Sequence, residues 1–214
     1  MQLFEAIDTP TYVYLVMEYV KGESLHSFLK RTQSRRMPED QIKIIMKQLF
    51  SILQYLHSQN VTHRDVKLEN ILIDRKSLQI KLIDFGFCCH SDKDQLLKIF
   101  CGTPSYMAPE IVNKTEYKGP PTDVWAAGVL CYAMLCGAFP FRGATDRELY
   151  SKISVGKLVW PEHLCISKEA RHFVEQMIEP DVRERHTTEQ LSKSAWLGFS
   201  GDFLSTEQSS GGLK

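Results

Sequence analysis

Eight residues, His63 to Asn70, constrain the fold of this chain more than any other stretch. They place an acid, a lysine and an amide within His-Arg-Asp-Val-Lys-Leu-Glu-Asn, between two apolar runs. A charged segment in such surroundings is expected to be a loop that the flanking elements hold in place. We therefore expect Asp65 to lie exposed on this loop, with the flanking runs in the core.

The apolar run after this loop predicts a β-hairpin. Residues 71–73 and 80–83 are rich in isoleucine and leucine, and a polar turn separates them. The two ends of a tight hairpin lie side by side. Because Asp65 and Asn70 precede the hairpin and Asp84 follows it, we expect the three side chains at one edge.

The remaining segments give a mixed α+β pattern. Residues 3–20 predict two strands around a turn, and residues 87–107 predict a long loop of the kind that carries function. Apolar spacing and capping residues predict helices at 24–31, 38–60, 123–135, after Ser167 and from Thr187.

Composition narrows the class of function. Lys+Arg and Asp+Glu both total 26, so no overall charge favours nucleic acid or a membrane surface. No apolar run is long enough to insert into a membrane, and no signal peptide is visible. The six cysteines form no CxxC pair, which favours reduced thiols in a cytoplasmic or nuclear protein.

Three short motifs follow one another along the chain. They are His-Arg-Asp at 63–65, Asp-Phe-Gly at 84–86 and Ala-Pro-Glu at 108–110, with Asp-Val-Trp at 123–125 downstream. In this order they resemble the signatures of protein kinases. A lysine two residues after the aspartate of this loop, here Lys67, resembles the pattern of the serine/threonine kinases. The resemblance is nearest to the calcium/calmodulin- and AMP-activated-kinase-like branch, and it implies the mainly helical C-lobe of a kinase fold.

The resemblance also implies a reaction and its cofactors. A kinase transfers the γ-phosphate of ATP, bound with Mg²⁺, to a serine or threonine hydroxyl of a protein substrate. Asp65 would accept and position that hydroxyl, and Lys67 would neutralise charge on the transferred phosphate. Asn70 and Asp84 would supply the oxygen ligands that Mg²⁺ prefers.

By the same resemblance, residues 1–17 would end the small N-lobe, 18–23 would form the hinge, and 24–199 would form the C-lobe. Residues 200–214 are Ser/Gly-rich and are expected to be disordered. The implied ATP contacts are Met17 as gatekeeper, Glu18, Val20, Glu23 and Leu72.

The acid expected to meet ribose or a substrate arginine departs from the family pattern. A single Gly22 precedes Glu23, whereas relatives with two glycines place the acid one residue later, which alters its reach. Glu69 is a second acid that could bind such an arginine.

Other residues have structural roles by resemblance. His63 and Phe85 would pack in an inner hydrophobic column, and Gly86 completes the turn after Phe85. Asp123 would anchor the backbone of the loop from the buried helix. Glu110 would form a buried ion pair with a downstream arginine, for which we choose Arg185 before Arg183.

The segment before Ala-Pro-Glu has an unusual residue. Ile99 stands where many relatives carry a phosphorylated threonine, so the phosphate that Arg64 would bind cannot form there. The segment must then be ordered in another way, stay disordered, or use another phosphorylated residue. Ser91 is the nearest such residue, and Ile99 could instead pack against the C-lobe as an apolar latch. Thr103 lies in the turn that the family uses to receive substrate.

Three kinase features do not occur in these 214 residues. They are the Gly-rich loop, the strand lysine of Val-Ala-Ile-Lys type and its helix glutamate. All would precede residue 1, so we expect a fragment, a partial gene product or a short isoform. A non-catalytic binding module is the rival interpretation. Neither the substrate nor the oligomeric state follows from the sequence.

Overall fold

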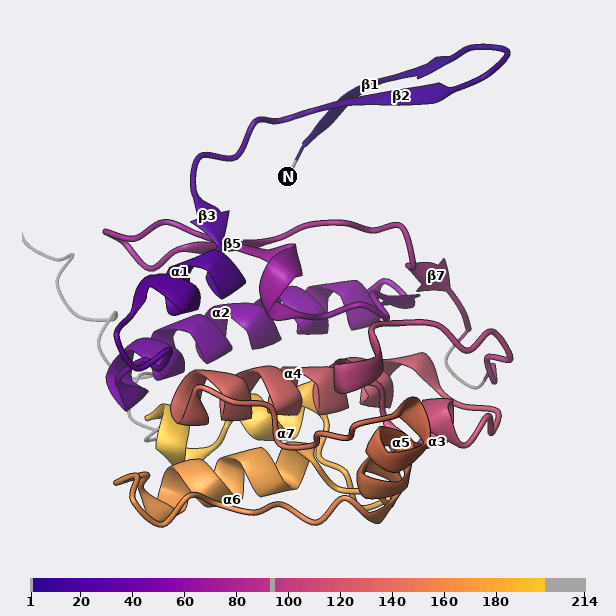
Figure 1. The fold of residues 1–214 in the computed structure, drawn as a ribbon. Helices are drawn as coiled ribbons and strands as arrows, with labels where there is room; N and C mark the ends of the chain where they lie inside the picture. The colour runs from indigo at the N-terminus through magenta and orange to yellow at the C-terminus, as the bar shows by residue number, and fades with distance from the viewer. Residues whose placement is uncertain (1, 93–94, 199–214) are drawn as a thin grey trace, which may run out of the picture.

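The structure, a computed structural model, describes residues 2–92 and 95–198. The tail expected at 200–214 lies outside the described residues. The predicted α+β class is confirmed: among the described residues a helical body carries two small sheets, and a third, the β1–β2 hairpin, projects above it (Figure 1).

All strand pairs are antiparallel, in the sheets β1–β2, β3–β5–β6 and β4–β7. The strands are β1 (Leu3–Asp8), β2 (Val13–Met17), β3 (Glu23–Ser24), β4 (Val61–Thr62), β5 (Ile71–Ile73), β6 (Ile80–Leu82) and β7 (Cys89–His90). The α-helices are α1 (Leu25–Arg31), α2 (Glu39–Ser58), α3 (Pro109–Val112), α4 (Gly119–Cys136), α5 (Asp146–Val155), α6 (Lys168–Met177) and α7 (Thr188–Ser192).

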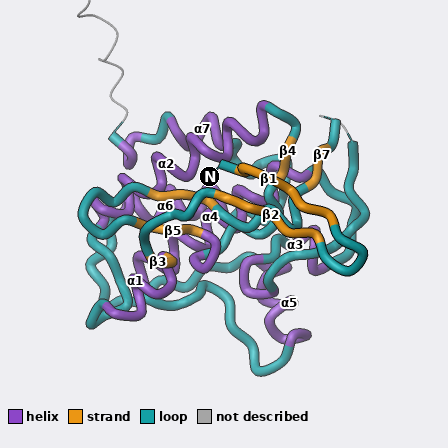
Figure 2. The backbone as a smooth tube through the Cα atoms, turned by 90° about the horizontal axis from the view of Figure 1, so that it is seen from above, coloured by secondary structure: helices purple, strands orange, loops and turns teal. Residues whose placement is uncertain are grey.

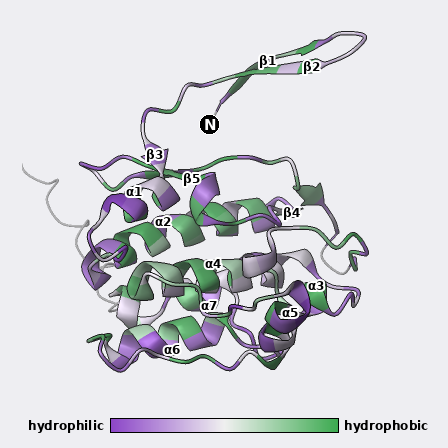
Figure 3. Ribbon diagram, in the orientation of Figure 1, coloured by the Kyte–Doolittle hydropathy of each residue, from purple (hydrophilic) through white to green (hydrophobic). Residues whose placement is uncertain are grey.

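Helix α4 is the centre of the core. It packs against α2 on one side and α6 on the other, and it is hydrophobic along its length in Figure 3. A helix that is apolar on every face is stable only when protein surrounds it. Trp125 is fully buried and stacks on Phe141 with ring centroids 5.8 Å apart. Among the described residues, no helix is long and apolar enough to cross a bilayer.

Three of the described helices differ from the sequence prediction, and one of them, the short α3, was not predicted at all. Helix α4 begins at Gly119, four residues before the predicted start at Asp123. Pro120 and Pro121 fit its first turn, where a helix needs no N–H donor. Helix α5 was not predicted, although the side chain of Thr145 caps it by accepting a hydrogen bond from the N–H of Glu148.

Strand β3 joins the body through a close approach that only glycine allows. Gly22 has φ +145°, and a Cβ there would lie 2.8 Å from the carbonyl oxygen of Ile73 in β5. The β5–β6 hairpin then closes on itself, since the N–H of Ile83 donates to the carbonyl of Asn70 at 2.9 Å. The predicted hairpin is therefore confirmed, and its two ends meet as expected.

The β1–β2 hairpin stands apart from the helical body (Figure 1). In the view from above it lies over the body (Figure 2). Its two strands pack mainly against each other, and no other helix or strand contacts them to a comparable extent. Its large apolar side chains are between 41% and 67% exposed. A lone two-stranded hairpin is marginally stable in water, so this element adds little to the core.

We expect the two regions to differ in local stability. In hydrogen exchange on this chain, the amides of β1 and β2 should exchange by local opening, many orders of magnitude faster than those of the buried helix α4. The β5–β6 hairpin is a matched control, because its side chains are packed in the body. Equal protection of β1–β2 and β5–β6, read by mass spectrometry, would contradict this description of the hairpin.

Candidate active site

A buried carboxylate positions the loop that carries Asp65. Asp123 on α4 is 1% exposed. Its two oxygens accept the backbone N–H groups of His63 at 3.0 Å and Arg64 at 2.8 Å. Nε2 of His57, in the last turn of α2, lies 2.9 Å from the same carboxylate. Asp123 thus lies where the resemblance implied an anchor.

The ring of His63 is fixed on both nitrogens. Nε2 lies 3.2 Å from the carbonyl of Ile83, which can only accept, so this nitrogen carries the proton. Nδ1 then accepts the N–H of Asp65 at 3.3 Å. Phe85 packs edge-on to this ring, with centroids 5.1 Å apart, but it is 43% exposed. His63 is buried, whereas Phe85 is only half enclosed by the expected column.

Asp65 is the centre of a hydrogen-bond network. Oδ2 accepts from Nζ of Lys67 at 2.6 Å and from Nδ2 of Asn70 at 2.9 Å, and Oδ1 accepts from the hydroxyl of Thr103 at 2.8 Å. The expectation that Asp65 is exposed was wrong, because the residue is only 4% exposed. The loop folds back on itself and residues around Thr103 cover it, which shields the carboxylate from water.

Asp84 and Asn70 provide a donor set suited to Mg²⁺. Both N–H donors of Asn70 are directed at Asp65, to its carbonyl and to its carboxylate, each at 2.9 Å. The amide oxygen is therefore the atom left for a cation. Asp84 is exposed, has φ +63°, and accepts the N–H of Gly86 at 3.2 Å. Carboxylate and amide oxygens are the hard ligands that Mg²⁺ takes.

The segment expected to bind ATP runs along β2 and β3. Met17 ends β2 and is 42% exposed, and Val20 is partly buried in the connection to β3. Lys81 of β6 forms an ion pair with Glu18, which lowers the pKa of that carboxyl. Leu72 in β5 pairs with Ser24 of β3 and is partly buried.

Glu23 already has two cationic partners. Arg75 in the β5–β6 turn forms an ion pair with it and lowers the pKa of its carboxyl, and Arg31 of α1 lies 3.2 Å away. Its side chain is 15% exposed. The carboxylate is therefore engaged within the chain.

The segment before Ala-Pro-Glu does not contain the apolar latch that was one of the expected alternatives. Ile99 is 69% exposed, so it does not pack as an apolar latch. Its carbonyl is the anchored group, because the hydroxyl of Tyr117 donates to it at 2.8 Å. Ser91 is 7% exposed, and its N–H donates to the carbonyl of Asn60 at 3.0 Å. In this conformation Ser91 is shielded from a modifying enzyme.

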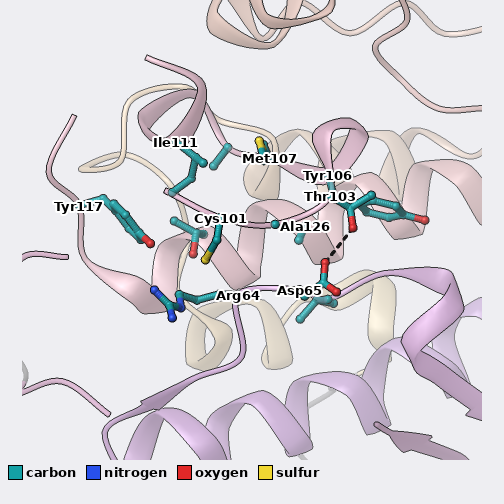
Figure 4. A pocket seen from close by; sticks show the side chains of 13 residues that line it. Arg64, Asp65, Cys101, Thr103, Tyr106, Met107, Ile111, Tyr117 and Ala126 are labelled. Carbon is teal, nitrogen blue, oxygen red and sulfur yellow. Dashed lines mark hydrogen bonds between the residues drawn. The ribbon is translucent and has the colours of Figure 1, made fainter. Parts of the chain in front are cut away.

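A small cavity lies between the loop and this segment (Figure 4). Arg64, Asp65, Thr103 and Tyr117 are among its lining residues. Its volume is about 20 Å³, which is room for about one water molecule. The segment therefore packs closely against the catalytic-type loop on this side.

Glu110 pairs with Arg185 rather than with Arg183. The two nitrogens of Arg185 donate to the two carboxylate oxygens of Glu110 at 2.7 and 3.1 Å, and the side chains are 0% and 7% exposed. Arg185 also donates to the carbonyl of Pro121 at 3.0 Å. Arg183 is 86% exposed and pairs with Asp181.

Three residues that hold the loop or its covering segment in place were not given this role by the sequence analysis. His57 and Tyr117 lie outside every motif, and Tyr106 accepts the N–H of Leu68 on its hydroxyl oxygen at 3.2 Å. No local pattern marks these residues, since each acts across the fold. For Tyr117, the one available signal is that it is an aromatic residue directly before a helix.

The sequence of this chain matches a known protein family. A family model described as "Protein kinase domain" matches residues 1–197. The chain therefore belongs to the protein kinase family, and the predicted resemblance is confirmed.

Its relatives include serine/threonine kinases of yeast and plants. "Serine/threonine-protein kinase ppk25" of Schizosaccharomyces pombe is 37% identical over 196 residues, which are 92% of this chain and 45% of that protein. "Serine/threonine protein kinase OSK3" of Oryza sativa subsp. indica is 38% identical over 92% of this chain and 38% of its own length. "CBL-interacting protein kinase 10" of Oryza sativa subsp. japonica is 34% identical over 95% of this chain and 45% of that protein.

The chain thus spans less than half the length of these relatives. They support the AMP-activated-kinase-like branch indicated by the sequence.

The buried ion pair should dominate the stability of this region. Removing one partner of such a pair leaves an uncompensated buried charge, at a cost of about 3–5 kcal/mol. Glu110→Ala and Arg185→Ala should both lower the free energy of unfolding by about this amount, measured with urea. Arg183→Ala is the matched control and should change it little, because its pair with Asp181 is exposed. An equal effect of all three variants would contradict the assignment.

Proposed function

We propose that this chain carries the catalytic loop of a protein kinase that transfers phosphate from ATP to serine or threonine. The observation that carries the proposal is the shared carboxylate of Asp65, which bonds Lys67, Asn70 and Thr103 at once. This places an acceptor, a cation and an amide within one network, as phosphoryl transfer requires. Membership of the serine/threonine kinase family supports the same reaction.

In this proposal Asp65 orients the substrate hydroxyl and accepts its proton. Burial and the fixed neighbours of the carboxylate keep it in one position, so little reorganisation is needed during the reaction. Lys67 has its ammonium 2.6 Å from Asp65 and 3.0 Å from the hydroxyl of Thr103. A cation there stabilises charge that develops on the transferred group.

Asn70 and Asp84 would hold Mg²⁺ together with the phosphates of ATP. Mg²⁺ supplies charge neutralisation on the phosphate oxygens. The contribution of the chain is to fix the two oxygen donors: Asn70 through its bonds to Asp65, and Asp84 through the left-handed turn before Gly86. Few protein ligands are needed, because Mg²⁺ rarely takes an all-protein cage.

The ATP contacts and the division of the chain are part of the same proposal. Residues 18–23 would be the hinge between residues 1–17, which would belong to the end of the N-lobe, and the C-lobe at 24–199. Residues of the hinge and Leu72 would enclose the adenine. The ion pairs of Glu23 with two arginines favour a structural role for that acid over one in binding ribose.

The partner in this proposal is a protein that presents a serine or threonine. Glu69 is exposed and lies close to Tyr106. Burial raises the pKa of the Tyr106 phenol, and the charge of Glu69 adds to this shift. This acid is available to an arginine upstream of the accepting residue, whereas Glu23 is occupied.

A non-catalytic binding module remains the second candidate. The observation that favours it is the hydroxyl of Thr103, which donates to Oδ1 of Asp65 and so occupies the oxygen that a substrate hydroxyl would need. An assay of phosphate transfer by the intact protein that contains these residues separates the two candidates.

The role of Asp65 is tested by a substitution that conserves shape. Asp65→Asn should lower kcat by about 10²–10⁴-fold, because the amide cannot accept the proton. The intact protein would be assayed with radiolabelled ATP and a serine-containing protein substrate. Asp40→Asn, at a side chain that is 93% exposed and remote from the loop, is the control and should leave kcat unchanged. Wild-type turnover by Asp65→Asn would exclude the proposed role.

The metal site is tested by binding rather than turnover. Asp84→Asn should weaken binding of Mg-ATP in calorimetry by roughly tenfold or more, because one anionic ligand is lost. Binding of ATP without Mg²⁺ is the internal control and should differ little between the two proteins. If Mg²⁺ strengthens ATP binding equally in both, Asp84 is not a ligand.

A further inference from the structure

One tyrosine fastens the segment that precedes Ala-Pro-Glu to the body. Tyr117 lies just before α4 and is 3% exposed. Its hydroxyl donates to the carbonyl of Ile99 at 2.8 Å. Its backbone exchanges two hydrogen bonds with Leu97, at 2.8 and 3.2 Å, in an isolated antiparallel bridge. The segment is thus tied at two points, two residues apart, to a single buried residue.

Arg64 belongs to the same cluster. Figure 4 shows the hydroxyl of Tyr117 directed toward the guanidinium of Arg64, and both residues line the small cavity. Nε of Arg64 donates to the carbonyl of Phe87 at 2.6 Å. Burial raises the pKa of the Tyr117 phenol, although the nearby guanidinium of Arg64 opposes this shift. The hydroxyl therefore stays protonated at neutral pH, so it can accept from Arg64 and donate to Ile99.

Packing around the tyrosine adds to these bonds. The ring of Phe100 lies 6.0 Å from that of Tyr117 and is partly buried. An exposed ion pair between Lys98 and Glu116, at 3.1 Å, contributes little. The side chain of Ile99 takes no part, because it points to solvent while its carbonyl is bound.

These contacts replace what a phosphate would provide. Phosphorylation orders a loop by adding a dianion that an arginine can bind. In this chain the neutral oxygens of Phe87 and Tyr117 lie against Arg64, and position 99 contributes only its backbone. We propose that Tyr117 is a positioning residue that orders residues 95–103 without phosphorylation, by bridging Arg64 and the carbonyl of Ile99.

The role of this ordering in catalysis rests on the proposed function, whereas the ordering itself does not. The ordered segment ends at Thr103, whose hydroxyl bonds Asp65. Holding residues 95–103 in place therefore holds one side of the candidate active site. The order of the segment itself can be measured without any assay of phosphate transfer.

The test is hydrogen exchange on this chain, read by mass spectrometry. Tyr117→Phe removes only the hydroxyl and should make residues 95–103 exchange roughly tenfold faster, the factor expected for one lost buried hydrogen bond. Helix α4 should be unaffected. Tyr132→Phe is the matched control, because its hydroxyl also donates to a backbone carbonyl, that of Val159 at 2.6 Å. It should leave residues 95–103 unchanged.

A second measurement uses the unsubstituted chain after phosphatase treatment, with removal of phosphate verified by mass spectrometry. Protection of residues 95–103 should persist. Loss of that protection overturns the proposal, as does equal exchange of the segment in the two tyrosine variants. If Tyr117→Phe also loosens α4, the phosphatase arm alone decides. An intact protein in which Tyr117→Phe loosens the segment, but which transfers no phosphate, contradicts the proposed function and supports this inference.

Discussion

The carboxylate of Asp123 is the contact on which the arrangement of the site depends. It reaches from the most buried helix to the backbone of the loop, where it accepts the N–H groups of His63 and Arg64. A buried carboxylate is costly unless hydrogen bonds satisfy it, and those two donors and the ring of His57 do so. The same bonds hold Arg64 at φ +64°, a conformation that a non-glycine residue adopts only under constraint, at a cost of about 1–3 kcal/mol. Hydrophobic burial of α4 therefore sets the position of a polar loop.

The segment that covers this loop is held at two places by different interactions. At its end, Glu110 is fixed by the guanidinium of Arg185, which also lies over the ring of Trp125 in α4. Nearer its middle, Tyr117 binds backbone rather than side chain. Both attachments lead back to the region of α4. One helix thus organises the loop and its cover, which explains why the site is ordered although the β1–β2 hairpin makes few contacts with the body.

The sequence predicted the elements better than it predicted exposure. Helical spacing and caps located α2, α6 and α7, and the hairpin around 74–77 was correct because a polar turn between apolar runs is a local signal. The start of α4 was missed because prolines suit a first turn as well as a loop. Asp65 was expected to be exposed and is buried, and the packing of Ile99 that was one alternative for its segment does not occur. Whether a side chain is covered depends on residues far away along the chain, and a local pattern carries no information about them.

The bond from Thr103 to Asp65 has a consequence for how a substrate would enter. The oxygen that a substrate hydroxyl would need is occupied by a hydroxyl of the chain itself. A serine or threonine that replaced it would exchange one hydroxyl for another of the same kind, so the hydrogen-bond energy of Asp65 would change little. Lys67 and Asn70 could keep their own bonds to the other oxygen throughout the exchange. If Asp65 has the role proposed for it, the hydroxyl of Thr103 lies where a substrate hydroxyl would lie, and the two hydroxyls would compete for the same carboxylate oxygen.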